Sequence, residues 1–191
     1  MSGTQGAGAV LVNGLPGAGK TTLARELAGE LRLPLFSKDT LKESLADSLA
    51  GLRPPGTADR EWSTVLGRAA AESLWALLAD AGGRAVLESF WPAPLRPVVA
   101  ASLERAGVAA AQEVWCEVPV AVARARFAAR APYRHPGHPV DPVDEGEARW
   151  REWERTAVPL ALGPVHRVGT TGPVDVPALA ARLSARRGSG R

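Results

Sequence analysis

Cysteine and lysine are scarce in this chain of 191 residues, and both shortages exclude classes of protein. The single cysteine, Cys116, excludes an intrachain disulfide framework and a cysteine-based zinc cluster, and it fits a reducing compartment. Only three of the 23 basic residues are lysines, so the net charge of +3 depends on arginine and is too small to predict a nucleic-acid partner. No segment resembles a signal peptide or a membrane span, which predicts a cytoplasmic protein with no membrane partner.

The apolar residues are sufficient for one sizeable core, because they make up 46% of the chain. We therefore expect a single domain over residues 1–191. Short apolar runs alternate with segments of helical period, which is typical of an α/β fold with a five-stranded, mainly parallel sheet and helices on both faces. The expected strands are 9–13, 33–37, 84–88, 108–116 and 165–168. The expected helices are 20–31, one beginning at 39, 62–80, one ending at 106, 120–131, 144–153 and 176–186, with loops at 51–59 and 132–142.

One segment between the first strand and the first helix matches the phosphate-binding pattern G-x-x-x-x-G-K-[S/T] in full. It predicts a cradle of backbone N–H groups for a nucleoside triphosphate at the positive end of a helix. Lys20 is expected to reach the β- and γ-phosphates, Thr21 to ligate Mg²⁺ and Thr22 to contact the α-phosphate. The segment comprises Gly14, Leu15, Pro16, Gly17, Ala18, Gly19, Lys20 and Thr21.

Asparagine is also scarce, and this narrows the reaction class. The guanine-reading motif N-K-x-D of switch GTPases is absent, because Asn13 is the only asparagine in the chain. The chain is too short for motor and AAA+ domains with their extra subdomains. A small phosphotransferase remains, with the three-layer P-loop NTPase fold.

Several segments together resemble the small P-loop kinases, a group that includes chloramphenicol phosphotransferase and, more distantly, the zeta-toxin, gluconate and shikimate kinases. The likeness extends along nearly the whole chain, and only the phosphate loop is highly specific. It rests on residues 14–22, 35–40, 86–89, 123–130 and 134–138. The resemblance implies a helical lid, here at about residues 120–145.

Two acidic residues follow predicted strands and are candidates for the acceptor side. The resemblance implies that Asp39 receives the proton of the acceptor hydroxyl, and a carboxylate at the carboxyl end of a strand can orient an alcohol for in-line attack. The alternative is that Asp39 only caps the next helix. Glu88 is expected to bind the acceptor or Mg²⁺-bound water, or else to pair with an arginine. Trp91 is expected to form a wall of the acceptor pocket or to pack in the core.

Arginines of the 120–131 helix could neutralise the charge of the transferred phosphoryl group. Arg126 and Arg130 share a helix face, whereas Arg124 points elsewhere, so at least one of the three should face solvent. The resemblance implies Arg124 and Arg130 as the lid arginines, followed by Arg134. The alternative is a solvated basic helix face.

The two remaining site predictions concern loops. His135 and His138 are three apart in a loop rich in proline, which argues against a metal site and favours a lid segment or a contact from His135 to the substrate. Thr170 lies in a segment that resembles the nucleotide-base loop of the family, although a plain turn explains it equally well.

These observations predict a Mg²⁺-dependent kinase that transfers the γ-phosphoryl group of ATP or GTP to a hydroxyl of a small molecule. The expected acceptor is an antibiotic or nucleoside natural product, and the protein is expected to be a monomer or homodimer. Two alternatives remain at this point. One is a nucleotide-dependent binding or regulatory protein without a small acceptor, and the other is a kinase that acts on nucleic-acid ends.

Overall fold

A five-stranded sheet forms the centre of the computed structural model, which describes residues 8–139 and 143–185. The strands are β1 (Val10–Asn13), β2 (Leu35–Ser37), β3 (Val86–Glu88), β4 (Gln112–Glu117) and β5 (Val165–Gly169). Their order is β2-β3-β1-β4-β5, and every neighbouring pair is parallel. The carboxyl ends of all five strands therefore meet at one edge of the sheet, where open α/β folds bind ligands.

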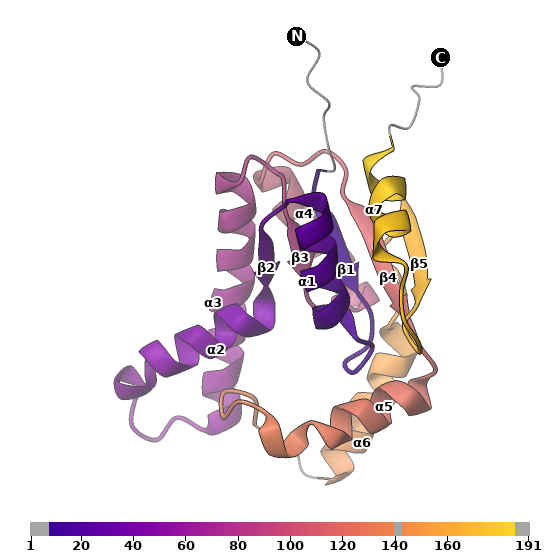
Figure 1. Cartoon of the computed structure of the whole chain (residues 1–191). Helices are drawn as coiled ribbons and strands as arrows, with labels where there is room; N and C mark the ends of the chain where they lie inside the picture. The colour runs from indigo at the N-terminus through magenta and orange to yellow at the C-terminus, as the bar shows by residue number, and fades with distance from the viewer. Residues whose placement is uncertain (1–7, 140–142, 186–191) are drawn as a thin grey trace.

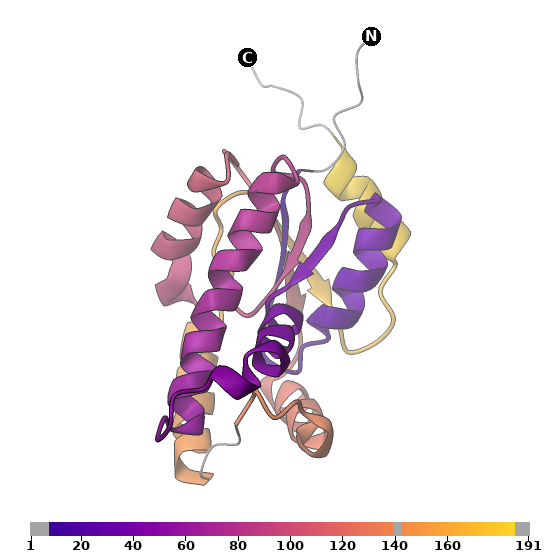
Figure 2. The same cartoon turned by 90° about the vertical axis from the view of Figure 1, so that its left-hand side faces the viewer.

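Helices cover both faces of this sheet (Figures 1 and 2), and the side chains of β1 show why. Val10 and Val12 pack into one core with α1 and α7, whereas Leu11 packs into a second core with α3 and α4. Because successive side chains of a strand point to opposite faces, the continuous apolar run of β1 is buried on both sides. The seven α-helices of the described ranges are α1 (Lys20–Leu31), α2 (Lys38–Ser48), α3 (Asp59–Asp80), α4 (Arg96–Arg105), α5 (Val120–Ala129), α6 (Val143–Thr156) and α7 (Val176–Ser184).

Helices α5 and α6 lie beyond the carboxyl edge of the sheet, below it in Figure 1. Aromatic edge-to-face contacts hold them together: Phe127 of α5 lies 5.5 Å from Trp150 and 5.9 Å from Trp153 of α6, measured between ring centroids. Trp153 also meets Phe90, which follows β3. Trp150 and Trp153 therefore pack the two helices together. The aromatic cluster also ties the predicted lid, α5 to α6, to the sheet.

The structure confirms the predicted fold and corrects several boundaries. The sheet is parallel throughout its five strands rather than mainly parallel. The expected strand at 108–116 begins only at Gln112, because residues 107–111 connect α4 to the sheet. The two expected loops also contain short 3₁₀ helices, η1 (Ala50–Leu52) and η3 (Ala131–Tyr133), and α3 begins three residues earlier than predicted. Another 3₁₀ helix, η2 (Ala93–Leu95), precedes α4.

Residues 140–142 of the predicted lid loop, like the two ends of the predicted domain, lie outside the described residues. Across 8–139 and 143–185, no helix combines the length and the apolar character that crossing a bilayer requires.

Candidate active site

The phosphate loop connects β1 to α1 and takes a backbone shape that glycine permits. Gly17 and Gly19 have φ values of +87° and +81°, a region that residues with a Cβ rarely adopt. A Cβ on Gly17 would lie 2.1 Å from the carbonyl oxygen of Ala123, in the first turn of α5. Both glycines are therefore required by the turn, and Gly17 is required also by the close approach of the lid helix.

The N-terminus of α1 is built to accept an anion. Its N-cap residue is Gly19, which offers no side chain to the first N–H groups, and the first turn carries no acidic residue. The partial positive charge of the helix end is thus left uncompensated by the protein itself. The expected phosphate position at this helix end fits these features.

Lys20 is a buried lysine at this helix end. Its Nζ donates to the carbonyl oxygen of Leu15 at 2.9 Å and lies 5.9 Å from the centre of the Phe90 ring. Burial lowers the pKa of Lys20, and the negative charge of Glu88 opposes that shift. The carbonyl contact curls the side chain over the loop, so that its ammonium is presented where a phosphate would lie.

The end of β2 and the start of α2 bring two predicted groups to the same edge. Ser37 holds the N-cap position of α2, and its hydroxyl donates to the Glu88 carboxylate at 2.6 Å rather than capping the helix. Asp39 lies in the first helical turn and has an exposed side chain, so the cap position belongs to Ser37. Glu88 is 3% exposed, and burial raises its pKa. The hydrogen-bond partner of Glu88 is thus a serine and not the arginine of the alternative prediction.

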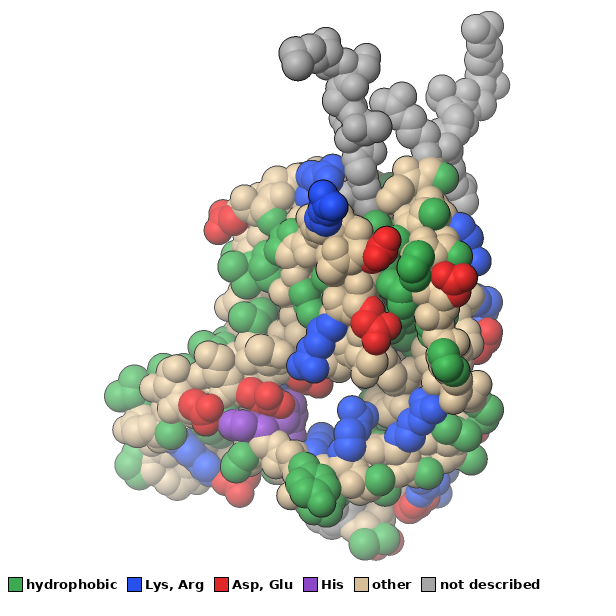
Figure 3. Space-filling view, viewed as in Figure 1, with side chains coloured by type: hydrophobic (Ala, Val, Ile, Leu, Met, Phe, Trp, Pro, Cys, Tyr) green, Lys and Arg blue, Asp and Glu red, His purple; other side chains and the backbone are tan. Residues whose placement is uncertain are grey.

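These groups line one cavity of about 630 Å³ at the carboxyl edge of the sheet, which we call the phosphate cleft. Figure 3 shows the hollow between the α2 region and the lid, rimmed by basic and histidine side chains. All three lysines of the chain line the cleft. The predicted residues that line it are Pro16, Gly17, Gly19, Lys20, Thr21, Asp39, Glu88, Arg130, Arg134 and His135.

A second cavity, of about 660 Å³, adjoins the phosphate cleft, and we call it the acceptor cavity because Trp91, predicted to contact an acceptor, lines it. Its walls come from α2, α3, α4, the segment after β3 and the lid. Trp91 lines it while remaining only 5% exposed, with its ring 6.0 Å from that of Trp75. Trp91 therefore packs in the core and also lines this cavity, and its contact with an acceptor remains a prediction. The residues shared by both cavities are Lys38, Lys42, Ser89, Phe90, Arg134, His138 and Arg149.

The three arginines of α5 have different surroundings. Arg130 lines the phosphate cleft. Arg124 instead forms an ion pair with Glu147 and lies over the Trp150 ring, both on α6. Arg126 donates to the carbonyl oxygens of Thr170 and Thr171, so it joins α5 to the loop after β5. The structure thus brings one of the two predicted lid arginines of α5 into the cleft and places the other against α6.

Other predicted residues of the phosphate loop and base loop lie outside the lining of the cleft. The buried residues Leu15 and Ala18 belong to the core below the loop, and Thr22 is exposed on α1. A Cβ on Gly14 would lie 2.8 Å from the carbonyl oxygen of Cys116, which shows how closely the loop start approaches β4. Thr170 is 8% exposed, and its hydroxyl donates to the Glu117 carbonyl at 3.3 Å.

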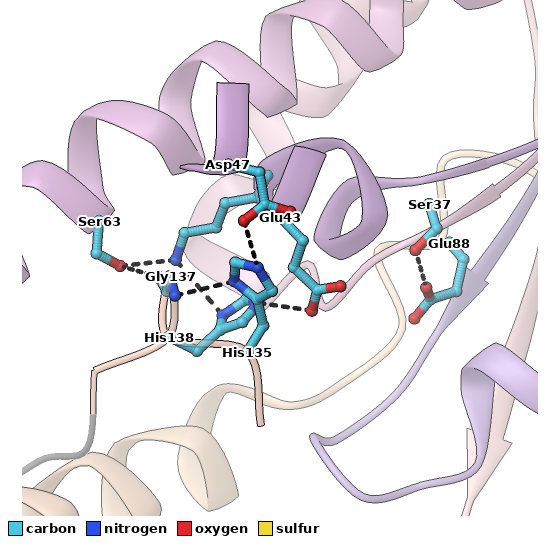
Figure 4. A network of polar contacts seen from close by, with 9 residues as sticks. Ser37, Glu43, Asp47, Ser63, Glu88, His135, Gly137 and His138 are labelled. Carbon is cyan, nitrogen blue, oxygen red and sulfur yellow. Dashed lines mark hydrogen bonds and ion pairs between the residues drawn. The ribbon is translucent and has the colours of Figure 1, made fainter. Parts of the chain in front are cut away.

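Two histidines of the lid form polar contacts with side chains of α2, as Figure 4 shows. His135 Nε2 lies 3.0 Å from Asp47 and His138 Nε2 lies 3.1 Å from Glu43, both on α2. Each histidine Nδ1 accepts a hydrogen bond, from the Gly137 N–H at 3.0 Å and from the Lys42 ammonium at 3.5 Å respectively. Burial lowers the pKa of His138. These contacts fasten the lid loop to α2.

Lys42 is the functional candidate that the sequence prediction missed. Its side chain is 8% exposed, and its ammonium donates to the Ser63 hydroxyl of α3 at 2.7 Å. Burial, followed by the nearby Lys38 charge, lowers its pKa. The available signal was compositional, because lysine is rare in a chain whose basic residues are mostly arginine.

Asn13 was also missed, and its buried side chain contacts both the start of the phosphate loop and Trp91. Its side-chain oxygen accepts from the N–H groups of Gly14 at 2.8 Å and Trp91 at 3.0 Å. Its amide donates to the Trp91 carbonyl and to the Glu113 carboxylate. Asn13 therefore holds the start of the phosphate loop against the segment that lines the acceptor cavity.

The donor set fits a magnesium ion that is shared with phosphates. Within the described ranges, no three His, Cys, Asp or Glu side chains form a cluster able to hold a metal alone. The Thr21 hydroxyl and the Glu88 carboxylate do line the phosphate cleft. Mg²⁺ prefers such oxygen ligands and typically binds through one or two protein groups plus phosphates and water.

Comparison with solved structures places this site in a kinase-like fold. The chain is 32% identical to a candidate kinase from Chloroflexus aurantiacus J-10-fl, with a TM-score of 0.77, and the match covers 95% of this chain and 100% of the other. Shikimate kinase from Acinetobacter baumannii, solved with shikimate, is 20% identical at a TM-score of 0.58, covering 93% of this chain and 90% of the other. The tunicamycin resistance protein of Deinococcus radiodurans is 18% identical at a TM-score of 0.54, covering 93% and 94%.

No curated protein matches the chain significantly. A family model does match, over residues 10–160, and its description is AAA domain. The matched range begins with β1 and ends after α6, so it contains the phosphate loop, both cavities' main walls and the predicted lid. The chain therefore belongs to the family described as AAA domain, so its length did not exclude that family, and it has the fold of the small P-loop kinases.

Proposed function

We propose that this protein is a kinase that transfers the γ-phosphoryl group of ATP or GTP to a hydroxyl of a small molecule. The acceptor that we propose is an antibiotic or nucleoside natural product, which would give a role in self-resistance. The main support is the juxtaposition of a phosphate cleft of about 630 Å³ with a second cavity of about 660 Å³, which offers room for an acceptor beside the donor.

On the donor side, the protein supplies position and charge. The loop amides and the N-terminus of α1 would hold the β-phosphate, and Lys20 would exchange its Leu15 carbonyl contact for phosphate oxygens. Thr21 would hold Mg²⁺, which would supply positive charge to offset the negative charge of the phosphates. Arg130 lines the cleft and would stabilise negative charge on the transferred group.

On the acceptor side, Asp39 would accept a hydrogen bond from the attacking hydroxyl and take its proton. Its carboxylate lines the cleft with Lys20, and its charge influences the pKa of Lys20, Glu88, Lys42 and His138. Glu88, held by the Ser37 hydroxyl, would orient the acceptor or a Mg²⁺-bound water. The hydroxyl oxygen would attack the γ-phosphorus in line while the bond to the β–γ bridging oxygen breaks.

The test is transfer of labelled phosphate from MgATP or MgGTP to a panel that includes chloramphenicol, nucleosides and hydroxy acids. With an acceptor found, Asp39→Asn should lower kcat by about 10²–10⁴-fold while nucleotide affinity stays unchanged. Asp80→Asn is the matched control, because Asp80 is the exposed last residue of α3 and lines neither cavity. It should leave kcat and nucleotide affinity unchanged.

Two results would contradict the proposal. Transfer that is unaffected by Asp39→Asn would remove the proposed base. A nucleotide-dependent regulatory protein would instead be favoured by three results together. Lys20→Ala would abolish nucleotide binding, no acceptor would receive phosphate, and Asp39→Asn would leave slow hydrolysis unchanged.

A further inference from the structure

One stripe of α3 runs along the acceptor cavity and changes in character along its length. Residues 60, 63, 64, 67 and 68 are polar, basic or small, whereas Ala71 and Trp75 are apolar, with Glu72 between them paired to Arg105. Their spacing of three and four residues places them on one helix face. At 1.5 Å per residue, Arg68 and Trp75 are separated by about 10 Å along the axis. The cavity thus has a polar end and an apolar end within the length of a small molecule.

The apolar end exposes more hydrophobic surface than the core requires. Trp75 and Trp91 form its floor, with ring centroids 6.0 Å apart. Leu95 of η2 and Val98 of α4 line the same end and are 40% and 56% exposed. Apolar side chains left open inside a cavity gain from contact with an apolar ligand.

The polar end is strongly cationic. Six Lys or Arg side chains line the cavity against one carboxylate, Glu72, which is itself paired with Arg105 at 3.1 Å. Lys42 contributes a nearly buried ammonium there, 2.7 Å from the Ser63 hydroxyl. An excess of cations around a cavity favours a ligand that carries negative charge.

Arg68 is a cation of the acceptor cavity that the nucleotide site does not use. It lines the acceptor cavity and is not among the residues that line the phosphate cleft. In the described parts of the chain, no hydrogen bond or ion pair occupies its guanidinium. Arg60, by contrast, is engaged by Glu145 at 2.6 Å. Arg68 is exposed at the cavity, so its guanidinium is available to a ligand there.

We propose that the acceptor is an amphipathic anion, with an acidic group that Arg68 and Lys42 bind and an apolar or aromatic part that rests on Trp75, Trp91 and Val98. This inference rests on the proposed function, which assigns the cavity to an acceptor, and it adds the chemical class of that acceptor. The acidic group is a carboxylate, sulfonate or phosphate, whose oxygens match the two donors of a guanidinium edge.

Two fluorescent probes of nearly the same shape test the proposal without nucleotide. One is 8-anilinonaphthalene-1-sulfonate, and the other is N-phenyl-1-naphthylamine, which lacks only the sulfonate. The unmodified full chain should bind the sulfonate probe at least about tenfold more tightly than the neutral probe. Equal affinities, or a preference for the neutral probe, would overturn the proposal.

Substitutions at three exposed positions test the acidic and apolar contacts of the proposed ligand separately. Arg68→Gln should weaken the sulfonate probe about tenfold and leave the neutral probe unchanged. Val98→Ser should weaken both probes alike. Arg182→Gln, on the exposed side of α7, is the control for lost surface charge and should change neither. A preference for the sulfonate that survives Arg68→Gln would also overturn the proposal.

The outcome can be separated from that of the proposed kinase. The probe experiment uses no nucleotide, so it stands whether or not phosphate is transferred. If transfer is found, acids in the panel should react with higher kcat/KM than their amides. A neutral acceptor that reacts better than its acid counterpart would reject the amphipathic anion while leaving the kinase intact.

Discussion

The phosphate cleft and the acceptor cavity have nearly the same volume but are assembled in different ways. The phosphate cleft takes its central groups from residues 16–21, one segment whose backbone is proposed to hold the nucleotide. The acceptor cavity takes its walls from five separate parts of the chain between Lys38 and Arg149. A site built from backbone depends on glycines and one helix end, whereas a site built from distant side chains depends on how whole helices pack. The two cavities can therefore be perturbed separately.

The largest expected effect distinguishes the two lid arginines. Arg130→Ala should lower kcat for phosphoryl transfer by about 10³-fold, because it removes a cation from the cleft in which charge develops. Arg124→Ala should lower kcat less than about tenfold, because Arg124 is engaged by Glu147 and Trp150 of α6. Single-turnover kinetics on both variants is the measurement. The reverse order would show that the lid rearranges when nucleotide binds.

A smaller effect is expected from the backbone of the phosphate loop. Gly17→Ala should weaken MgATP about 100-fold, because a Cβ there is strained at φ +87° and meets the Ala123 carbonyl. Gly29→Ala is the matched control within α1, where a Cβ meets nothing within 4 Å, and it should stabilise the protein by about 0.5–1 kcal/mol. Calorimetric titration and thermal unfolding measure the two effects. Unchanged MgATP affinity in Gly17→Ala would contradict the proposed cradle.

The next effect concerns the stability that Asn13 provides between the phosphate loop and the segment at Trp91. Asn13→Ala should lower the free energy of unfolding by about 2–3 kcal/mol, since it removes the partners of two buried N–H groups, a carbonyl and a carboxylate. It should also weaken ligands of both cavities. Glu117→Gln, which breaks the exposed pair with Arg167, should change stability by less than about 0.5 kcal/mol. Urea unfolding of both variants decides whether Asn13 is the common support.

The smallest effect concerns pH and the histidine contact with α2. Burial keeps the folded pKa of His138 below its ordinary value of 6.5, with Lys42 and Arg134 adding to the shift and Asp39 and Glu43 opposing it. The unfolded chain therefore takes up the proton first, so this contribution to stability is present above pH 6.5 and is lost as pH falls toward the folded pKa. Between pH 7.5 and 5, the wild type should lose more stability than His138→Gln. Equal losses, measured from urea midpoints, would contradict this assignment.

The sequence predicted best what contiguous residues and periodicity determine. The phosphate loop, the five strands and the helices on both faces follow from glycine spacing and from apolar runs such as β1. The placement of Lys20, Thr21, Asp39 and Glu88 at one edge follows from parallel strands that end together. Their catalytic roles remain predictions.

The rest of the site depended on contacts across long separations in sequence. Lys42 acquires its role from Ser63, 21 residues away, and from His138, 96 residues away. Helical spacing alone could place Arg124 and Arg130 on different faces but could not say which one faces the cleft, because the position of α6 decides it. The aromatic packing of α5 on α6 is a tertiary property.

The close approach of Gly17 to Ala123 has a mechanical consequence for the lid. The first turn of α5 is pinned to the phosphate loop, so that end acts as a fixed pivot rather than a moving arm. Any swing of this helix toward bound nucleotide would carry Arg130 farther than Arg124, in proportion to their distances from the pivot. A label at the far end of α5 would therefore report such a swing with the greatest amplitude, and one beside Ala123 would remain almost still.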